Sequence, residues 1–260
     1  MLFVLLITWA CATTPTGRNQ LQFFSSQQLS EMGRMSYRQV KKEEKVIRHQ
    51  GVNRFVECVT RSITSALPAS AGRTQWEVTI FDGDDSINAF ALPGGYIGVY
   101  TGLRKVVENQ DQLAAVIGHE IAHVTAEHPN ARLSTQYATQ TGLQVVDAFL
   151  AGQTGSNSRN IMALLGLGTQ VGLLLPFSRS QEKEADILGL QYMARAGFDP
   201  RQSVELWKNM ARAGGGKPPE FLSTHPSDYS RIQTLQAHMP EALELYRQAG
   251  QQNRRPQCRP

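Results

Sequence analysis

Residues 109–129 read NQDQLAAVIGHEIAHVTAEHP, and their apolar positions recur at the three- and four-residue intervals of a helix with one buried face. Asn109 is a suitable N-cap, and Gln112 three residues later completes a capping-box pattern. Pro129 is expected to end the helix, because proline cannot continue the hydrogen-bond ladder. This stretch therefore predicts a helix with a buried apolar stripe.

The motif His119-Glu120-Ile121-Ala122-His123 lies inside this helix. Positions four residues apart share one helix face, so the imidazoles of His119 and His123 can bind the same metal ion. Glu120 is rotated by about 100° around the helix axis, and from there its carboxylate can act as general base on a metal-bound water. A pair of surface histidines is the alternative, but the flanking residues are apolar, and buried imidazoles without a partner are costly. The motif predicts one Zn²⁺ ion per chain.

A third ligand has to come from another part of the chain, because catalytic zinc has three protein ligands and one open position. The metzincin pattern is excluded, since Pro129 stands where its third histidine would be and Ala126 where its glycine would be. His128 is interpreted as a charged residue favoured near a helix C-terminus. Asp147 is the one carboxylate between His128 and residue 181, and it is embedded in an apolar run.

The acidic cluster at residues 182–186 supplies better candidates. Glu182 and Asp186 lie one turn apart on a predicted helix over 181–196, whereas Glu184 points largely away from them. Glu182 is therefore predicted to be the third zinc ligand. Asp186 is predicted to accept the free N–H of a ligand histidine, which fixes the orientation of the ring. Glu184 is expected on the solvated surface.

Alternating and helical patterns elsewhere predict a small sheet and several further helices. The apolar segment Ile161–Phe177 is short for a bilayer span, so we interpret it as a buried helix, with a membrane span as the alternative. The predicted fold is α+β, mostly helical, with a small mixed sheet beside the motif helix. Strands are expected at residues 76–81, 86–92 and 96–100, and helices over 26–67, 101–107, 181–196, 201–213 and 227–248.

The N-terminus indicates export. Residues 1–10, MLFVLLITWA, form an apolar run that is too short to span a bilayer and is typical of a signal peptide, although no basic residue precedes it. Cys11 follows a small residue, as at the processing site of bacterial lipoproteins, and this predicts a lipid on Cys11; a signal cleaved without lipidation is the alternative. The expected division of the chain is a signal peptide over 1–10, a lipid-anchored tether over 11–25, a zinc-binding domain over 26–250 and a polar tail over 251–260.

Two cysteines remain once Cys11 is assigned to the lipid. In an oxidising compartment, Cys58 and Cys258 predict a disulfide that ties the C-terminal tail to the first helical segment. Two unrelated thiols are the alternative. Neither cysteine has a second cysteine or a histidine at ligand spacing, so zinc binding at these positions is not expected.

The charge distribution argues against nucleic-acid binding. The net charge is only +4, and the basic residues are scattered, with short clusters at Lys41-Lys42 and Arg254-Arg255. A nucleic-acid surface needs basic residues concentrated on one face, with aromatic residues among them. No nucleic-acid partner is expected.

Four stretches of the chain carry a further signal. They are Asn88-Ala89-Phe90-Ala91-Leu92-Pro93-Gly94-Gly95, His119–His123, Phe177-Ser178-Arg179 with Glu182-x-x-Ala185-Asp186, and Ser223-Thr224-His225-Pro226-Ser227 followed by Arg231-Ile232. Together and in this order they resemble the zinc metallopeptidases related to the heat-shock protease HtpX and the CAAX prenyl endopeptidases, a gluzincin family whose bacterial periplasmic lipoproteins are the most similar members. The resemblance implies a small gluzincin fold. It also implies a periplasmic endopeptidase, anchored to the outer membrane, that hydrolyses misfolded or damaged envelope polypeptides.

The resemblance also implies roles for individual residues. Asn88, Ala89 and Phe90 would belong to an edge strand that binds an extended peptide by β-addition, with an ordinary hairpin strand as the alternative. His225 would donate to the tetrahedral oxyanion, and Arg231 would bind and orient the same part of the substrate. A chaperone-like outer-membrane assembly lipoprotein with little proteolysis is the second interpretation of the chain. The intact metal motif argues against it, because a binding module does not need a general base.

Overall fold

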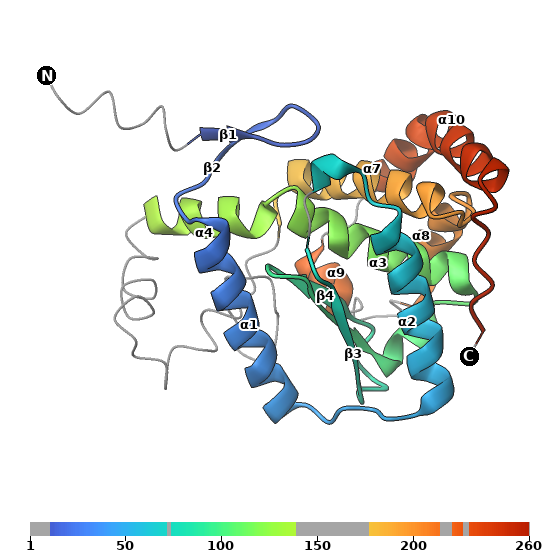
Figure 1. Cartoon of the computed structure of the whole chain (residues 1–260), viewed down its shortest axis with the longest axis horizontal. Coiled ribbons are helices and arrows are strands. Elements are labelled where there is room, and N and C mark those ends of the chain that lie inside the picture. Colours follow the sequence, from blue (N-terminus) through green and yellow to red (C-terminus); the bar gives the residue numbers. More distant parts are fainter. Residues whose placement is uncertain (1–10, 72–73, 139–176, 214–219, 226–228, 260) are drawn as a thin grey trace, which may run out of the picture.

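A computed structural model of the chain describes residues 11–71, 74–138, 177–213, 220–225 and 229–259. Within them, helices surround a small three-stranded sheet (Figure 1), which is the mostly helical α+β arrangement expected from the sequence. The predicted signal peptide over 1–10 and the apolar segment over 161–176 lie outside the described residues. None of the described helices combines the length and the apolarity that a bilayer crossing requires.

The helical pattern over 26–67 is divided into two helices, because residues 44–49 run beside the sheet, where the backbone N–H of Ile47 donates to the carbonyl of Ile80. The described elements are β1 (Cys11–Thr13), β2 (Asn19–Leu21), α1 (Ser26–Glu43), α2 (Gln50–Ser65), η2 (Ala69–Ala71), β3 (Glu77–Phe81), β4 (Ala89–Leu92), β5 (Tyr96–Tyr100), η3 (Thr101–Lys105), α3 (Gln110–Thr125), α4 (His128–Ala138), α7 (Arg179–Arg195), α8 (Gln202–Ala213), α9 (Glu220–Thr224) and α10 (Tyr229–Gln251).

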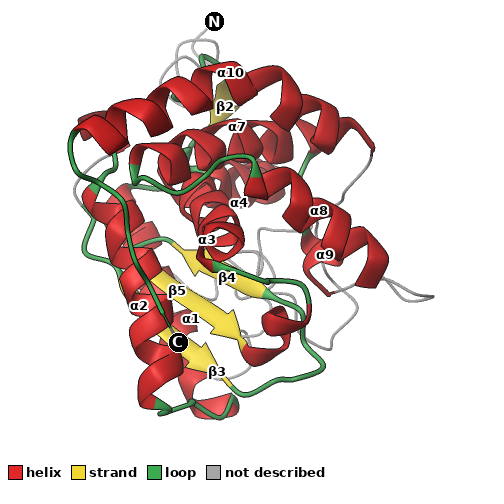
Figure 2. Cartoon of the chain, turned by 90° about the vertical axis from the view of Figure 1, so that its right-hand side faces the viewer, coloured by secondary structure: helices red, strands yellow, loops and turns green. Residues whose placement is uncertain are grey.

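The sheet is mixed, with strand order β3-β5-β4: β3 is parallel to β5, and β4 is antiparallel to β5 (Figure 2). Alternate side chains of β4 point to opposite faces. Phe90 and Leu92 pack in a cluster with the buried side chains of α1, while Ala89 and Ala91 join the main core with α3. Because alanines face α3, the backbone of the motif helix can lie close to β4, which forms one edge of the described sheet.

The motif helix α3 begins where the sequence predicts. The side chain of Asn109 accepts hydrogen bonds from the backbone N–H groups of Asp111 and Gln112, which closes the N-terminus. The side chain of Gln112 reaches one residue further back than in a capping box and accepts from the backbone N–H of Glu108.

The end of the motif helix was predicted wrongly. Helix α3 ends at Thr125, and the chain reverses at Glu127, which has a positive φ of 57°. Pro129 does not stop α3 but lies in the first turn of α4, where the missing N–H of proline costs no hydrogen bond. The reversal turns His128 back toward α3 instead of leaving it at the end of the helix.

Residues 11–25, expected to be a tether, contain an antiparallel hairpin, β1–β2, which we call the N-terminal hairpin. The side chain of Gln20 donates to the carbonyl of Ala126 at 2.8 Å, and Arg18 forms an ion pair with Glu184 at 2.9 Å. The segment therefore packs on the end of α3 and on α7. These two contacts of the hairpin are polar, so a hydrophobic pattern could not have revealed them. Lipidation of Cys11 stays a prediction.

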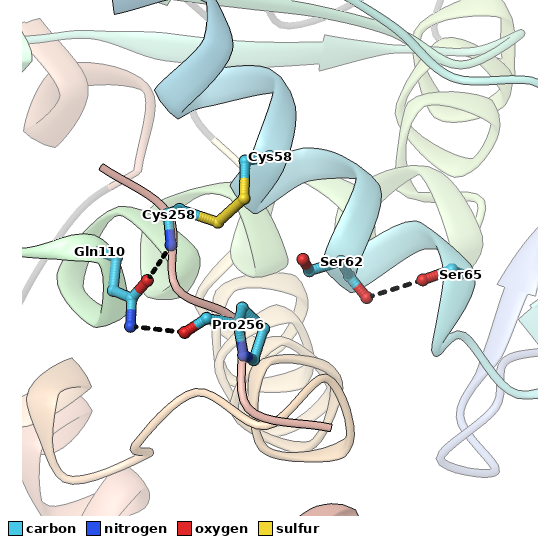
Figure 3. Close-up of a disulfide and its surroundings, with 6 residues drawn as sticks. All are labelled: Cys58, Ser62, Ser65, Gln110, Pro256 and Cys258. Atoms are coloured by element: carbon cyan, nitrogen blue, oxygen red, sulfur yellow. Dashed lines mark hydrogen bonds between the residues drawn. A yellow bond between two sulfur atoms is a disulfide. The ribbon is translucent and has the colours of Figure 1, made fainter. Parts of the chain in front are cut away.

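The disulfide between Cys58 and Cys258 is present and joins α2 to the C-terminal tail across a sequence separation of 200 residues (Figure 3). Gln110, in the first turn of α3, holds the same tail on both sides. Its side-chain amide donates to the carbonyl of Pro256 at 3.0 Å and accepts from the backbone N–H of Cys258 at 2.8 Å. The tail is thus fixed to α2 and to the start of the motif helix, and the cross-link restricts the unfolded chain.

Helices α3 and α7 cross at a point where both carry glycine. A Cβ atom added to Gly118 would lie 2.9 Å from the carbonyl oxygen of Gly189, and one added to Gly189 would lie 2.8 Å from the backbone nitrogen of His119. The two backbones can approach this closely only because neither position has a side chain. The crossing brings the histidines of α3 next to the acidic cluster of α7.

The substitution Gly189→Ala is expected to lower the free energy of unfolding by about 1–3 kcal/mol, because the added methyl group meets backbone that cannot move aside. This loss should appear even though alanine favours a helix over glycine by about 1 kcal/mol. Urea denaturation measures the effect. Gly250→Ala in α10 is the matched control, since a Cβ there meets only the flexible side chain of Arg255. Equal losses in both variants would contradict the close crossing.

Candidate metal centre

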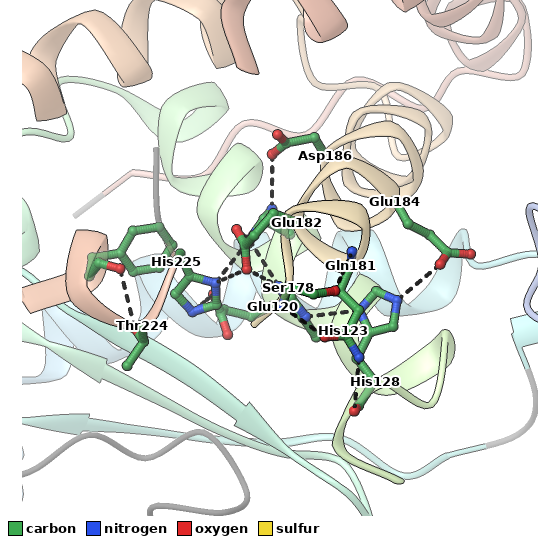
Figure 4. Close-up of polar contacts among 12 residues, drawn as sticks. Glu120, His123, His128, Ser178, Gln181, Glu182, Glu184, Asp186, Thr224 and His225 are labelled. Atoms are coloured by element: carbon green, nitrogen blue, oxygen red, sulfur yellow. Dashed lines mark hydrogen bonds and ion pairs between the residues drawn. The ribbon is translucent and has the colours of Figure 1, made fainter. Parts of the chain in front are cut away.

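Four buried side chains converge at the centre of the domain: His119 and His123 from α3, Glu182 from α7, and His225 just after α9. One ligand atom of each lies within 4.8 Å of those of the others. Figure 4 shows His123, Glu182 and His225 pointing toward one another from separate elements. Each of the four residues is at most 3% exposed, so these polar groups need partners inside the protein.

The two motif histidines turn the same ring atom toward the centre. Their Nε2 atoms are 3.1 Å apart, and each lies close to the Glu182 carboxylate, at 3.4 Å for His119 and 3.3 Å for His123. The Nδ1 atom of His119 points away and lies 3.1 Å from Asp186. The predicted contact between the second carboxylate and a motif histidine is thus seen in the structure, and it leaves Nε2 free to bind a cation.

The start of α7 sets the position of Glu182. Ser178 and Gln181 form a capping box, in which each side chain accepts a hydrogen bond from the other's backbone N–H. Glu182 therefore lies in the first turn, where the helix dipole favours a carboxylate. Phe177, just before the cap, stacks on the ring of His123 with 4.0 Å between ring centroids.

Arg231 of α10 holds the two carboxylates of α7. It donates to Glu182 at 2.8 Å and to Asp186 at 2.9 Å, and its guanidinium lies 3.6 Å from the centre of the Trp207 ring. Burial raises the pKa of Glu182, but neighbouring positive groups, Arg231 among them, outweigh burial and hold it well below its usual value. The resemblance suggested a substrate-binding role for Arg231. In the structure it is only 4% exposed and contacts the carboxylates instead.

Glu120 is buried beside the converging ligand atoms. Its Oε1 atom has no hydrogen-bond partner among the described residues, although Glu120 is only 3% exposed, and this atom lies 3.4 Å from Nε2 of His225. The backbone of Ala91 in β4 hydrogen-bonds the carboxylate, and burial raises the pKa of Glu120 above its usual value. An unpartnered carboxylate oxygen with a raised pKa is suited to accept a proton from a water molecule held at this site.

The donor set fits a divalent cation. Burial lowers the pKa of His119, but the carboxylates of Asp186 and Glu182 outweigh burial and raise that pKa to about 9. Two imidazoles and one carboxylate are the ligands of catalytic zinc in one class of metallopeptidase. The chemistry of the site thus fits Zn²⁺ held by His119, His123 and Glu182.

His225 lies among the proposed metal ligands. Its Nδ1 atom is 3.2 Å from Nε2 of His119 and 3.0 Å from Glu182, which places it among the ligand atoms. A catalytic zinc keeps this fourth position open for water. The ring would have to turn away before it could donate to an oxyanion. The sequence motif alone does not specify the conformation of the loop that carries His225.

Two residues that the sequence analysis set aside belong to the surroundings of the site. His128 is fully buried, and its Nδ1 atom lies 2.9 Å from Nδ1 of His123, while its Nε2 atom lies 3.1 Å from Glu184. Glu184, expected in solvent, is 3% exposed. Burial raises the pKa of Glu184, but hydrogen bonds from His128 and from Thr14, Thr16 and Arg18 of the N-terminal hairpin outweigh burial and hold it well below its usual value.

A helix with His-Glu-x-x-His, a glutamate from a second helix and a small mixed sheet alongside define a metallopeptidase domain of the zincin class. The sequence profile of peptidase family M48 matches residues 50–239, and the chain belongs to this family. The family is metal-dependent, in agreement with the donor set described above.

Known relatives of the chain include mitochondrial and bacterial peptidases. Mitochondrial metalloendopeptidase OMA1 of Schizosaccharomyces pombe is 39% identical over 170 residues, which cover 65% of this chain and 48% of the relative. Metalloendopeptidase OMA1 of Danio rerio is 33% identical over 247 residues, which cover 88% of this chain and 50% of the relative. The beta-barrel assembly-enhancing protease of Escherichia coli is 31% identical over 209 residues, which cover 78% of this chain and 42% of the relative. The chain spans about half the length of these relatives or less.

Proposed function

We propose that the chain is a zinc-dependent endopeptidase that hydrolyses peptide bonds in unfolded or misfolded polypeptides of the cell envelope. One observation carries the proposal. The Nε2 atoms of His119 and His123 and the carboxylate of Glu182 converge on one point, and the unpartnered oxygen of Glu120 lies beside it. Three ligands and a separate general base are what peptide hydrolysis by a metal-activated water requires.

Each buried residue has a defined task in the proposed reaction. Bound zinc supplies a Lewis acid and lowers the pKa of a water molecule. Glu120 takes the proton of the attacking water at its unpartnered Oε1 and later gives it to the leaving amine. Asp186 accepts a hydrogen bond from the Nδ1–H group of His119, and this orients the ring so that Nε2 would face a bound cation. Arg231 keeps Glu182 ionised and in place.

The edge of β4 that pairs with no other strand in the described part of the chain is the proposed binding site for the substrate backbone. The N–H of Tyr100 donates to the carbonyl of Asn88, so the backbone groups of Asn88 and Phe90 point toward β5. Those of Ala89 and Ala91 therefore point to the other side, where Ala91 contacts Glu120. An extended peptide added along this edge would pass the general base. The Phe90 ring packs against Phe81, so it stabilises the strand.

The envelope location and the lipid anchor are also proposals. They are supported by the signal-like run over 1–10, by Cys11 directly after it, and by the likeness to the beta-barrel assembly-enhancing protease of Escherichia coli. A chaperone-like role without cleavage would leave the buried Glu120 carboxylate without a use. Proteolysis therefore accounts for more of the described site.

The test is peptide cleavage coupled to metal analysis. The purified full chain is expected to hydrolyse an unstructured protein such as casein, to lose this activity when a chelator removes the metal, and to regain it with Zn²⁺, because the chain alone offers no activated water. Elemental analysis should find one zinc per chain. A chain that binds zinc but leaves casein intact at every zinc concentration would contradict the proposal and favour a binding role.

A further inference from the structure

Beyond His123, a buried row of polar contacts leads away from the metal centre to the N-terminal hairpin. Nδ1 of His123 meets Nδ1 of His128 at 2.9 Å, and Nε2 of His128 meets Oε2 of Glu184 at 3.1 Å (Figure 4). Hairpin side chains then donate to the same carboxylate, among them Arg18 through Nε at 2.9 Å and Thr16 through its hydroxyl at 2.5 Å. Neither His128 nor Glu184 has a role in the proposed chemistry.

The contacts define which atom carries each proton. When Nε2 of His123 binds a cation, the proton of this ring is on Nδ1. Among the described residues its hydrogen-bond acceptor is Nδ1 of His128, which must then be unprotonated. The proton of His128 is therefore on Nε2, which donates a hydrogen bond to Glu184. Arg18 donates to Glu184 from the other side. Each ring nitrogen in the row is thus either a donor or an acceptor. The Glu184 carboxylate, which can only accept, selects this arrangement of protons.

We propose that His128, Glu184 and Arg18 are positioning residues for the metal ligand His123, so that the N-terminal hairpin is part of the zinc site. The inference rests on the proposed zinc ligands. It parallels the other motif histidine, since Asp186 accepts directly from His119 whereas Glu184 acts on His123 through one intervening ring. Carboxylates that orient ligand histidines typically change metal affinity by about 10–100-fold when they are removed.

The competing explanation is that the same contacts only attach the hairpin to the domain. The exposures of the residues make the two explanations separable. The side chain of Glu184 is 3% exposed and that of Arg18 is 28% exposed, so Arg18 can be shortened without opening a cavity. Attachment alone would alter the stability of the protein and leave zinc affinity unchanged. Positioning would alter zinc affinity and the exchange of the His123 ring proton.

The experiment uses the full chain with Glu184→Gln, Arg18→Ala and the control Arg34→Ala. Arg34 is a similarly exposed arginine, also paired with a glutamate, at 35% side-chain exposure in α1. Competition with a chromophoric chelator measures the zinc dissociation constant. We expect Glu184→Gln to weaken zinc binding by about tenfold or more, Arg18→Ala by a smaller factor, and Arg34→Ala not at all. Because Arg18→Ala removes only a partly exposed side chain, it remains informative should Glu184→Gln fail to fold.

A second readout follows the protons themselves. In zinc-loaded protein with ¹⁵N-labelled histidine, the Nδ1 proton of His123 should exchange slowly with solvent in the wild type and faster in Glu184→Gln and Arg18→Ala. The Nδ1 proton of His119 should be unaffected. Wild-type zinc affinity and slow exchange in both variants would overturn the inference alone. Failure of the wild-type chain to bind zinc would contradict the proposed function itself, and the inference would fall with it.

Discussion

Glu120→Gln is expected to reduce kcat/KM for peptide cleavage by about 10²–10⁴-fold while the protein still binds zinc. The amide has nearly the same shape as the carboxylate but cannot take a proton from water. Glu120 is not one of the four converging residues, so the donor set should survive the substitution. The burial that raises the pKa of Glu120 is also the reason why no solvent base can replace it.

Casein cleavage and elemental analysis on the same preparation distinguish a loss of catalysis from a loss of bound zinc. Glu57→Gln, an exposed residue of α2, makes the same chemical change away from the site and should retain full activity. A Glu120→Gln protein that cleaves casein at the wild-type rate would refute the assignment of the general base. Loss of zinc from this variant would show instead that Glu120 belongs to the ligand set.

Those parts of the site that depend only on the spacing of residues within a single helix were predictable from the sequence. The four-residue spacing of His119 and His123, and of Glu182 and Asp186, places each pair on one helix face whatever the rest of the chain does. The alternating strands and the turn between β4 and β5 were recognisable for a similar reason, because strand and turn signals are local. The close crossing at Gly118 was not anticipated, since nothing local indicates which surface a glycine will face.

The residues that were misjudged depend on contacts between distant segments. Glu184 was expected in solvent because it lies on the opposite face of α7 from Glu182. His128 of α4 and the N-terminal hairpin, 166 residues away at Arg18, cover it instead. His128 was expected at a helix end, and the reversal at Glu127 places it in a second helix that faces the first. One sequence signal could have indicated the contact between His128 and Glu184. A buried histidine needs a hydrogen-bond acceptor, and the acidic cluster at residues 182–186 offers one.

The family resemblance implied that His225 donates to the oxyanion and that Arg231 binds the substrate, and both roles stay predictions. In the structure both residues contact the proposed ligands. His225 lies within 3.0 Å of Glu182, and Arg231 forms hydrogen bonds with the same residue. A motif in a loop identifies the residue and not the conformation of the loop. Glu182 therefore has more partners than its role as a ligand alone requires, which makes it the most informative residue to change.

Glu182→Gln is expected to weaken zinc binding by more than the roughly 10–100-fold typical of a residue that only orients a ligand. The amide retains the volume of the side chain and an acceptor for Arg231, so folding should be preserved, but it removes the charge that the cation needs. Zinc titration with a competing chelator measures the affinity. Thermal unfolding with and without zinc checks it independently, because a ligand bound only by the folded state stabilises that state.

Glu205→Gln, an exposed and salt-bridged residue of α8, is the control and should bind zinc as the wild type does. Zinc-induced stabilisation should be large in the wild type and the control and small in Glu182→Gln. If Glu182→Gln binds zinc as tightly as the wild type, the metal must be held by the three remaining converging residues, His119, His123 and His225. A three-histidine site of that kind would leave the carboxylate of α7 without a direct role, and the assignment of this chain to the glutamate-ligated class of zinc peptidases would be wrong.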